Sequence, residues 1–393
     1  MLALSCPTQS YDWGSTHAIP GFQRQESDGR RVAEVWIGTH PLGTARVVDG
    51  TEEGRSLTEV AGELGFMLKV LAADRPLSIQ VHPDADRAAA GFADEEAAGV
   101  PLGAPHRVFK DPHPKPEMVY ALSTFDTLVG LRRTSEIMRI LEALETPLTD
   151  ELMASLIDNT GFGGIVTLIG GLLADPPPAD VVDGVAAACQ KALDGGRDVK
   201  RAYETAVELA ESSPGDVGVI ISLLLNRLTL QPGEAAYLDT GIIHAHLRGL
   251  CLEVMVSSDN VLRAGLTTKH IDAPGLVRCL AEGTSRAARV EPLVFNYSTD
   301  VFSPGGDFAL SVTQSSPADP AGVVLPATGP RLLVCTGGEV ALVNRRDQVL
   351  RLGRGDAAYA DDTDGELRVA GTGEIAQAFV PGTGARGQLF DLL

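Results

Sequence analysis

The chain has 393 residues, 44% of them hydrophobic, which is enough for two or three domains with packed cores. Its formal net charge of −20 at pH 7 argues against nucleic acid or an anionic membrane as a partner. The 43 glycines and 24 prolines favour a fold rich in turns and strands.

The cysteines and the apolar segments point to the cytoplasm. The five cysteines are odd in number and dispersed, without a C-x-x-C pair, so reduced thiols are expected rather than a disulfide framework. The most apolar stretch, residues 161–174, is too short to span a bilayer. The first residues lack the basic region and apolar run of a signal peptide. We therefore expect a cytoplasmic protein without a membrane partner.

Three regions with different residue patterns follow one another along the chain. Residues 1 to about 130 read as strands, among them "AEVWIGTH", "FMLKVLA", "LSIQVHP" and "PEMVYAL", with one Ala-rich helix predicted over 84–99. From about 133 to 212, apolar residues recur at spacings of three and four, which predicts helices. Strands resume near 217 and continue to the end.

The stretch "SIQVHPD" (78–84) alternates polar and apolar residues. As a strand it places Ser78, Gln80 and His82 on one face and two aliphatic residues on the other. A solvated strand face is one interpretation. A Gln and a His two residues apart are equally suited to converge on one ion.

Further donor pairs occupy other predicted strands. "KPEMVYAL" places Lys115 and Glu117 on one face, and Pro116 between them favours an edge position or a strand beginning. "GIIHAHLRG" places His244 and His246 together after a glycine turn. Gln, His, Glu and His form a nitrogen-and-oxygen set that Zn²⁺, Mn²⁺ or Fe²⁺ accepts. The residues alone do not choose between the two histidines, and a pair of hydrogen-bonded barrel histidines is the structural alternative.

Cationic residues accompany these donors. Lys69, Lys115, Arg263 and Lys269 would add positive charge around such an ion, which suits a phosphorylated ligand. Each of them taken alone is more typical of a solvated surface.

A weak internal repeat appears in the later strands. "LTLQPGEAAYLDTG" begins at 228 and "LRLGRGDAAYADDTDG" at 350, an offset of 350 − 228 = 122 that pairs Gly233 with Gly355. Two related β-barrel modules would produce it. The same offset pairs His244 with Glu366, so we expect the second module to hold no metal.

Five stretches, in order and spacing, resemble the type I mannose-6-phosphate isomerases, zinc enzymes of the cupin superfamily. These are "YDWGS" (11–15), "AEVWIGTHPLG" (33–43), "LSIQVHPD" (77–84), "KPEMVYAL" (115–122) and "HAHLRGLCLEVMVSSDNVLRAGLTTKHID" (244–272). The resemblance implies one Zn²⁺ per chain, other divalent metals being possible, with the ligands Gln80, His82, Glu117 and His244. It implies the catalytic residues Arg263, Lys115, Glu253 and Asp259, and the substrate-binding residues Lys69, Ser78, Lys269 and Trp13.

Two positions depart from that family pattern. The family usually has Tyr where this chain has His246, and Asn-His where it has His113 and Pro114. If the family His assists opening of the sugar ring, His113 or another group has to do so here.

The resemblance implies a mainly β fold of two cupin-type jelly-roll barrels with an inserted helical domain. We expect a catalytic barrel from 1–130 and 217–275, a helical insertion at 131–216, and a C-terminal barrel at 276–393. The implied reaction interconverts mannose 6-phosphate and fructose 6-phosphate by proton transfer through an enediol or enediolate. Lys115, whose pKa a nearby zinc and Arg would lower, is one base candidate beside Glu253 and Asp259.

Two alternatives to that reaction remain open from the residues. One is a cupin isomerase of another sugar phosphate, and the other is a sugar-sensing cupin without turnover. In either case the expected partner is a small sugar phosphate, and the expected assembly is a monomer or a small homo-oligomer.

Overall fold

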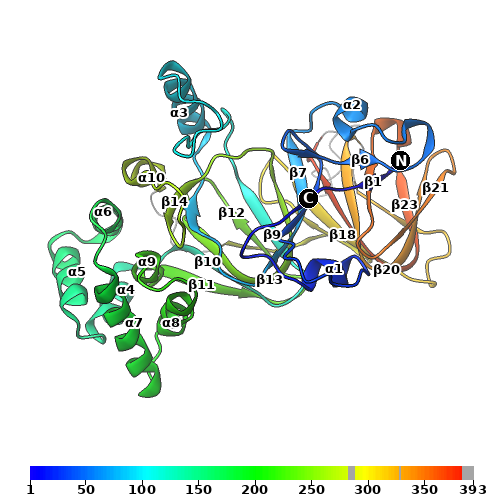
Figure 1. Cartoon of the computed structure of the whole chain (residues 1–393). Coiled ribbons are helices and arrows are strands. Elements are labelled where there is room, and N and C mark those ends of the chain that lie inside the picture. The colour runs from blue at the N-terminus through cyan, green and yellow to red at the C-terminus, as the bar shows by residue number, and fades with distance from the viewer. Residues whose placement is uncertain (282–287, 327–328, 383–393) are drawn as a thin grey trace.

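The structure is a computed structural model that describes residues 1–281, 288–326 and 329–382. Two large antiparallel sheets curl into barrels that lie side by side, and a group of helices covers the far end of the first barrel (Figure 1). Every register pairing between the strands is antiparallel, and many neighbouring strands are not consecutive in the chain. The prediction of a mainly β fold with an inserted helical part is confirmed.

The first sheet contains the strands from which the candidate site is built. Its strands are β2 (Thr8–Gln9), β3 (Glu34–Ile37), β7 (Phe66–Ala73), β8 (Ile79–Val81), β9 (Glu117–Ala121), β10 (Phe125–Leu131), β11 (Leu225–Leu230), β12 (Ala235–Leu238), β13 (His244–Val256), β14 (Leu262–Gly265) and β15 (Ala288–Val290).

Strand β13 organises this sheet. Its first residues pair with β8 and β10, and from Gly249 onward it pairs with β7 and β9. Gly249 has a φ of +120°, and a Cβ there would lie 2.5 Å from the carbonyl oxygen of Thr124. Glycine is therefore required where the strand passes from one set of partners to the other.

Helices fill the chain between β10 and β11. They are α4 (Thr134–Glu142), α5 (Pro147–Asp158), α6 (Gly161–Ala174), α7 (Ala179–Asp194), α8 (Ala202–Ser212) and α9 (Gly218–Ser222). Their apolar sides share one core with Ile79 and Val81 of β8. Because side chains alternate along a strand, this packing turns Gln80 toward the barrel interior.

The remaining helices lie outside that group. They are α1 (Ala18–Phe22), α2 (Leu57–Ala61), α3 (Ala85–Ala97), α10 (Ala273–Cys279) and the 3₁₀ turns η1 (Gly50–Glu52) and η2 (Asp362–Asp364). Helix α3 confirms the Ala-rich helix predicted over 84–99, and Asp84 caps it by accepting a hydrogen bond from the Arg87 amide. Among the described residues no helix is both long and apolar enough to cross a bilayer.

The second sheet forms the other barrel. Its strands are β1 (Leu2–Ser5), β6 (Arg46–Val47), β16 (Leu293–Asn296), β17 (Thr299–Phe302), β18 (Ala309–Ser315), β19 (Val323–Val324), β20 (Arg331–Asn344), β21 (Val349–Gly353), β22 (Ala357–Ala360) and β23 (Leu367–Phe379). A separate small hairpin joins β4 (Thr39–His40) to β5 (Gly43–Thr44).

The internal repeat is visible in both barrels. Strands β11 and β12 are joined through Gly233, with φ +93°, and β21 and β22 through Gly355, with φ +91°. Each hairpin is followed by a 13-residue strand, β13 in one barrel and β23 in the other. The predicted strand, glycine turn and strand are confirmed in both copies.

The strand pairings depart from the predicted boundaries. Strand β1 pairs with β22 and with β6, so these N-terminal strands belong to the second sheet and not to the catalytic barrel. Strand β15 pairs with β12 and so joins the first sheet, although it lies after the predicted domain boundary at 276. Helix α9 lies entirely after the predicted end of the helical domain at 216. Hydrogen bonding between sequence-distant strands decides these memberships, which local pattern does not encode.

Candidate active site

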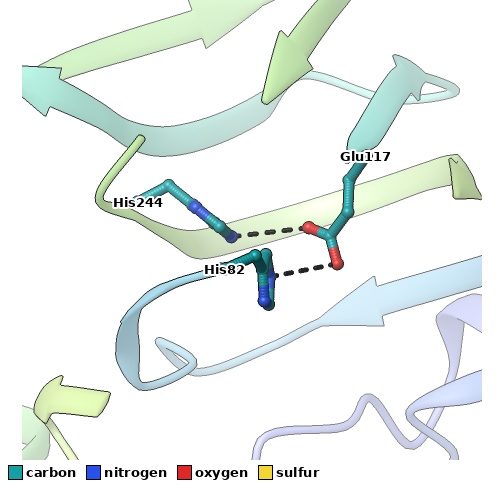
Figure 2. Close-up of side chains that lie close together, drawn as sticks. All are labelled: His82, Glu117 and His244. Carbon is teal, nitrogen blue, oxygen red and sulfur yellow. Dashed lines mark ion pairs between the residues drawn. The ribbon is translucent and has the colours of Figure 1, made fainter. Parts of the chain in front are cut away.

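Gln80, His82, Glu117 and His244 meet inside the first barrel. Gln80 is the central residue of β8, His82 follows the last residue of that strand, and Glu117 and His244 begin β9 and β13. Figure 2 shows His82, Glu117 and His244 pointing toward one another from these three separate segments. Pro116 directly precedes β9, so the predicted strand beginning is confirmed.

The donor atoms lie close together around one carboxylate. His82 Nε2 is 3.3 Å from Glu117 Oε1, and His244 Nε2 is 3.4 Å from Glu117 Oε2. The Gln80 amide nitrogen lies 3.3 Å from His244 Nε2, and a half-turn of the amide group brings its oxygen to the same place.

Backbone carbonyls fix the tautomers of both histidines. His82 Nδ1 lies 2.7 Å from the carbonyl oxygen of Asn260, and His244 Nδ1 lies 2.9 Å from that of Ile242. A carbonyl only accepts, so Nδ1 carries the hydrogen in each ring. Nε2 is then a bare lone pair turned toward the carboxylate, which is how protein metal ligands are oriented.

These four residues fit a divalent metal. Bonds of about 2.1 Å to a tetrahedral ion place neighbouring ligand atoms about 3.4 Å apart, which matches the separations around Glu117. His82 Nε2 and Glu117 Oε2 are buried and make no hydrogen bond within the described structure, so both lone pairs are free for an ion. Neutral imidazole, amide and carboxylate suit zinc and its neighbours.

The protonation states also suit metal binding. Burial, followed by the nearby Lys115 charge, lowers the pKa of His82 to about 4. Burial alone would raise the pKa of Glu117, but Lys115 and the two histidines hold it well below the usual range. At neutral pH the cluster therefore presents a neutral ring and an ionised carboxylate, the states that bind metal.

A lysine lies against the central carboxylate. Lys115 Nζ is 2.9 Å from Glu117 Oε1, and its side chain is buried. The Lys115 amine therefore lies beside the candidate metal position, within reach of a ligand bound there.

A second buried lysine sits between two acids. Lys69 Nζ lies 3.0 Å from Glu253 Oε2 and 3.6 Å from Glu34 Oε1, and Glu34 accepts a 2.7 Å hydrogen bond from Trp36 Nε1. Burial would lower the pKa of Lys69, but Glu253 and Glu34 raise it overall. Burial would likewise raise the pKa of Glu253, yet Lys69 brings it to about 2. Both groups stay charged at neutral pH.

Asp259 forms a dyad with His40. The Leu42 amide donates to His40 Nδ1, so Nε2 carries the hydrogen that faces Asp259 Oδ2 at 3.3 Å. Burial raises the pKa of Asp259, but the His40 contacts and the more distant Lys115 lower it overall. A cavity of about 890 Å³ opens beside the dyad, with His113 among its lining residues. Asp259 thus places an ionised carboxylate at a wall of this cavity.

Three cations gather on the β14 side. Arg263 lies opposite Gln80 in the register of β8 and β14, and its guanidinium makes no hydrogen bond or ion pair with the described residues. Burial lowers the pKa of Arg263, and the pKa of Lys269 is lowered by burial first and then by Arg263 and Lys110. Because Arg263 and Lys110 both lower the pKa of Lys269, the three positive charges lie near one another, which is an arrangement for an anion.

Trp13 and Ser78 lie at the periphery of this cluster. Trp13 stacks on Tyr11 with ring centroids 5.4 Å apart. Burial raises the pKa of Tyr11, and the charges of Glu34, Lys69 and Asp259 also affect it. Ser78 is half-buried just before β8. No contact joins either side chain to the four donors within the described structure.

The sequence reasoning missed several residues of the site. Glu34 and His40 lie in "AEVWIGTHPLG", Lys110 lies five residues before Lys115, and Asn260 follows Asp259. The Asn260 side chain bonds the Lys110 amide and the carbonyls of Asp111 and His113, tying that loop to β14. For Glu34, His40 and Asn260, their position inside matched motifs was the available signal, whereas Lys110 lies outside every matched stretch.

The fold consists of two cupin-type barrels. One of them encloses a set of His, Glu, His and Gln donors beside buried lysines. This combination defines a metal-dependent cupin enzyme. A model of the type I phosphomannose isomerase catalytic domain matches residues 1–134. The mannose-6-phosphate isomerase of Escherichia coli K12 is 33% identical over 390 residues, covering 94% of this chain and 97% of that protein. The human mannose-6-phosphate isomerase is 32% identical over 315 residues, covering 71% and 72%.

Solved structures agree with these relatives. The Salmonella typhimurium mannose 6-phosphate isomerase bound to fructose 6-phosphate and zinc superposes with a TM-score of 0.86 at 31% identity, covering 97% of this chain and 99% of that one. A zinc-bound mannose 6-phosphate isomerase gives a TM-score of 0.86 at 31% identity, covering 96% and 99%. The chain therefore belongs to the mannose-6-phosphate isomerase family.

Proposed function

We propose that this protein interconverts mannose 6-phosphate and fructose 6-phosphate, and that Gln80, His82, Glu117 and His244 hold one zinc ion for the reaction. The observation that carries the assignment is the pair of bare Nε2 atoms, on His82 and His244, that face Glu117 at 3.3 and 3.4 Å. Zinc held there would supply Lewis acidity toward an oxygen of the open-chain sugar.

The cationic residues orient the sugar phosphate. Arg263, Lys269 and Lys110 supply positive charge for the phosphate or the reacting oxygens, against a net chain charge of −20. The planar guanidinium of Arg263 has no protein partner within the described residues. It is therefore free to bind an anion through two parallel hydrogen bonds, as a bidentate donor. Lys115, next to Glu117, is placed to donate a hydrogen bond to a sugar oxygen bound beside the metal.

Asp259 is the group we assign to proton transfer between carbons 1 and 2. It is ionised at neutral pH, is oriented by His40 and lies at the cavity wall. Glu253 is paired with Lys69, which lowers its pKa to about 2, so we assign it to orienting its neighbours. The proton that leaves carbon 2 returns to carbon 1, and a hydroxyl proton passes from the oxygen on carbon 2 to the oxygen on carbon 1, so the enediol forms and collapses without a net change in charge.

One imidazole at the cavity is suited to ring opening. His40 and His113 both line the space beside Asp259, where Pro114 leaves no imidazole at its own position. Both nitrogens of His40 are engaged by Leu42 and Asp259, so His113 is the ring suited to passing a proton between the ring oxygen and the anomeric hydroxyl.

A coupled assay tests the function. Purified, zinc-loaded protein should form fructose 6-phosphate from mannose 6-phosphate, lose activity on chelation, and regain it when zinc returns. Turnover of a different sugar phosphate in place of mannose 6-phosphate would overturn the substrate assignment. Binding of sugar phosphate by metal-replete protein without any turnover would indicate a sensor and overturn the enzymatic proposal.

We further propose that the protein works in the cytoplasm, since its five cysteines are all free. The expected monomer or small homo-oligomer, and the absence of nucleic acid or membrane as partner, stay predictions. The division into a catalytic barrel, a helical insertion and a C-terminal barrel also stays a prediction. Strands β1, β6 and β15 are the exception, because their pairing places them in the other sheet.

A further inference from the structure

A second group of donors lies beside the proposed zinc ligands, and two of its three members, His246 and Glu253, play no part in holding that ion. The ligand atoms of Glu117, His246 and Glu253 all lie within 4.8 Å of one another, and the three side chains are buried. Glu117 belongs to both groups, so the two sets share one carboxylate.

The tautomer of His246 is coupled to the hydroxyl of its neighbour Thr127. The Thr127 hydroxyl lies 3.0 Å from the carbonyl oxygen of Ala245 and 3.1 Å from His246 Nδ1. The hydroxyl has one hydrogen, and the carbonyl can only accept it. With that hydrogen on the Ala245 carbonyl, Thr127 accepts from His246 Nδ1 and Nε2 is left as a bare lone pair, which is the tautomer in which this ring binds a cation.

That lone pair faces another acceptor. His246 Nε2 is 3.5 Å from Glu253 Oε1, is buried with the side chain 1% exposed, and makes no hydrogen bond among the described residues. Glu117 Oε2 is unpaired in the same space. Acceptors that converge without a donor repel one another unless a cation lies between them.

The pattern repeats the geometry of the first centre. In His82, His244 and His246 alike, Nδ1 is tied to an oxygen acceptor and Nε2 faces a carboxylate oxygen at 3.3 to 3.5 Å. Two ligand atoms of a tetrahedral ion with bonds of about 2.1 Å stand about 3.4 Å apart. The same reasoning that places an ion at the first set applies to the second.

We propose that His246, Glu253 and Glu117 form a second divalent-cation subsite, with Glu117 bridging it to the first. The mixed nitrogen and oxygen donors select a first-row ion such as Zn²⁺, Mn²⁺ or Co²⁺. This subsite goes beyond the proposed function, which needs one ion.

The surrounding charges set the order of filling. Glu34, Glu117 and Glu253 face Lys69 and Lys115, so the first divalent ion already turns the cluster net positive. Lys69 contacts Oε2 of Glu253 and leaves Oε1 free for a metal. The second ion binds against this positive charge, so it binds more weakly than the first and fills only in excess metal.

Metal titration of stripped full-length protein, followed by calorimetry, tests the subsite. Wild type should bind one Mn²⁺ or Zn²⁺ tightly and a second at least about tenfold more weakly, whereas His246→Gln should bind only the first. Thr127→Val, which removes the Nδ1 anchor, should weaken the second event by about 10- to 100-fold while leaving the first unchanged. A single binding event in wild type, or a second event that survives His246→Gln, overturns the proposal.

Crystals of the wild-type protein give a readout that does not depend on how variants fold. Soaked in excess Mn²⁺, they should show two anomalous peaks that share Glu117, one of them next to His246 Nε2. A lone peak at the first set would mean that a proton on His246 satisfies Glu253 instead, and the subsite would not exist. Neither measurement uses turnover, so failure here leaves the isomerase assay to decide the proposed function by itself.

Discussion

Arg263 lies directly opposite Gln80 where β14 pairs with β8, so a guanidinium and an amide proposed to hold zinc are cross-strand neighbours. His244 lies opposite Gln80 on its other side, in β13. Gln80 thus lies between His244, another proposed metal ligand, and Arg263, the proposed anion-binding residue. The spacing between neighbouring strands fixes the distance from the metal site to the anion site.

The first prediction concerns Arg263→Lys, which keeps the charge but loses the planar fork. Since loss of a donor to a developing oxyanion costs about 10² to 10³ in turnover, we expect kcat to fall at least about tenfold with zinc content unchanged. Steady-state kinetics and metal analysis check this. Arg278→Lys, on the exposed side of α10, is the matched control and should stay near wild type. Near-normal kcat in a metal-replete Arg263→Lys protein would make Arg263 a structural residue.

The second prediction compares Glu117→Gln with Glu366→Gln. Glu117 is the carboxylate that both histidines face, so its loss should abolish stable zinc binding and activity. Glu366 occupies the position equivalent to His244 in the second barrel and pairs with Arg368 at the surface. Its substitution should change neither, because we expect no metal there. Elemental analysis of both variants decides, and loss of metal in Glu366→Gln would contradict the prediction.

The third prediction assigns the proton transfer. Asp259→Asn should lower kcat by about 100-fold or more if Asp259 is the base, and His40→Gln should lower it less, because His40 acts through Asp259. Glu63→Gln, which lines the same cavity without contacting the dyad, is the control. Exchange of the carbon 2 proton with solvent is the readout. Unimpaired exchange in Asp259→Asn would assign the base to Lys115 or Glu253.

The fourth prediction concerns stability and pH through Asp126 of β10. Its carboxylate bonds Arg227 at 2.7 Å and Arg248 at 3.2 Å, and Arg201, the residue before α8, lies 3.3 Å away. Burial raises the pKa of Asp126, but hydrogen bonds from Arg227 and Thr229 bring it to about 2.

Because the folded pKa of Asp126 lies below its ordinary value, its contribution is complete above about pH 4 and is lost as pH falls toward 2. Asp126→Asn should therefore lower the free energy of unfolding by on the order of 2 kcal/mol at pH 7, and the difference should vanish near pH 2. Denaturant titrations at several pH values measure it, with the exposed Asp94→Asn of α3 as control. A pH-independent difference would mean that packing, and not charge, is lost.

The sequence by itself determined the donors and the elements that carry them. A period of two in "SIQVHPD" and "KPEMVYAL" puts Gln80 with His82, and Lys115 with Glu117, on common faces, because side chains alternate along any strand. The helical spacing after 133 and the repeated strand, glycine turn and strand are equally local, and the structure contains both.

Only the tertiary structure decided which histidine joins which acid. His244 and His246 share a face, yet the register of β13 sets His244 against Gln80 and His246 against Thr127, and the fold of the barrel then brings Glu117 to His244 and Glu253 to His246. Register between strands more than 100 residues apart depends on the packing of the whole barrel, not on a local pattern. The same long-range pairing carries β1 into the second barrel and His40 to Asp259, contacts that no spacing along the chain encodes.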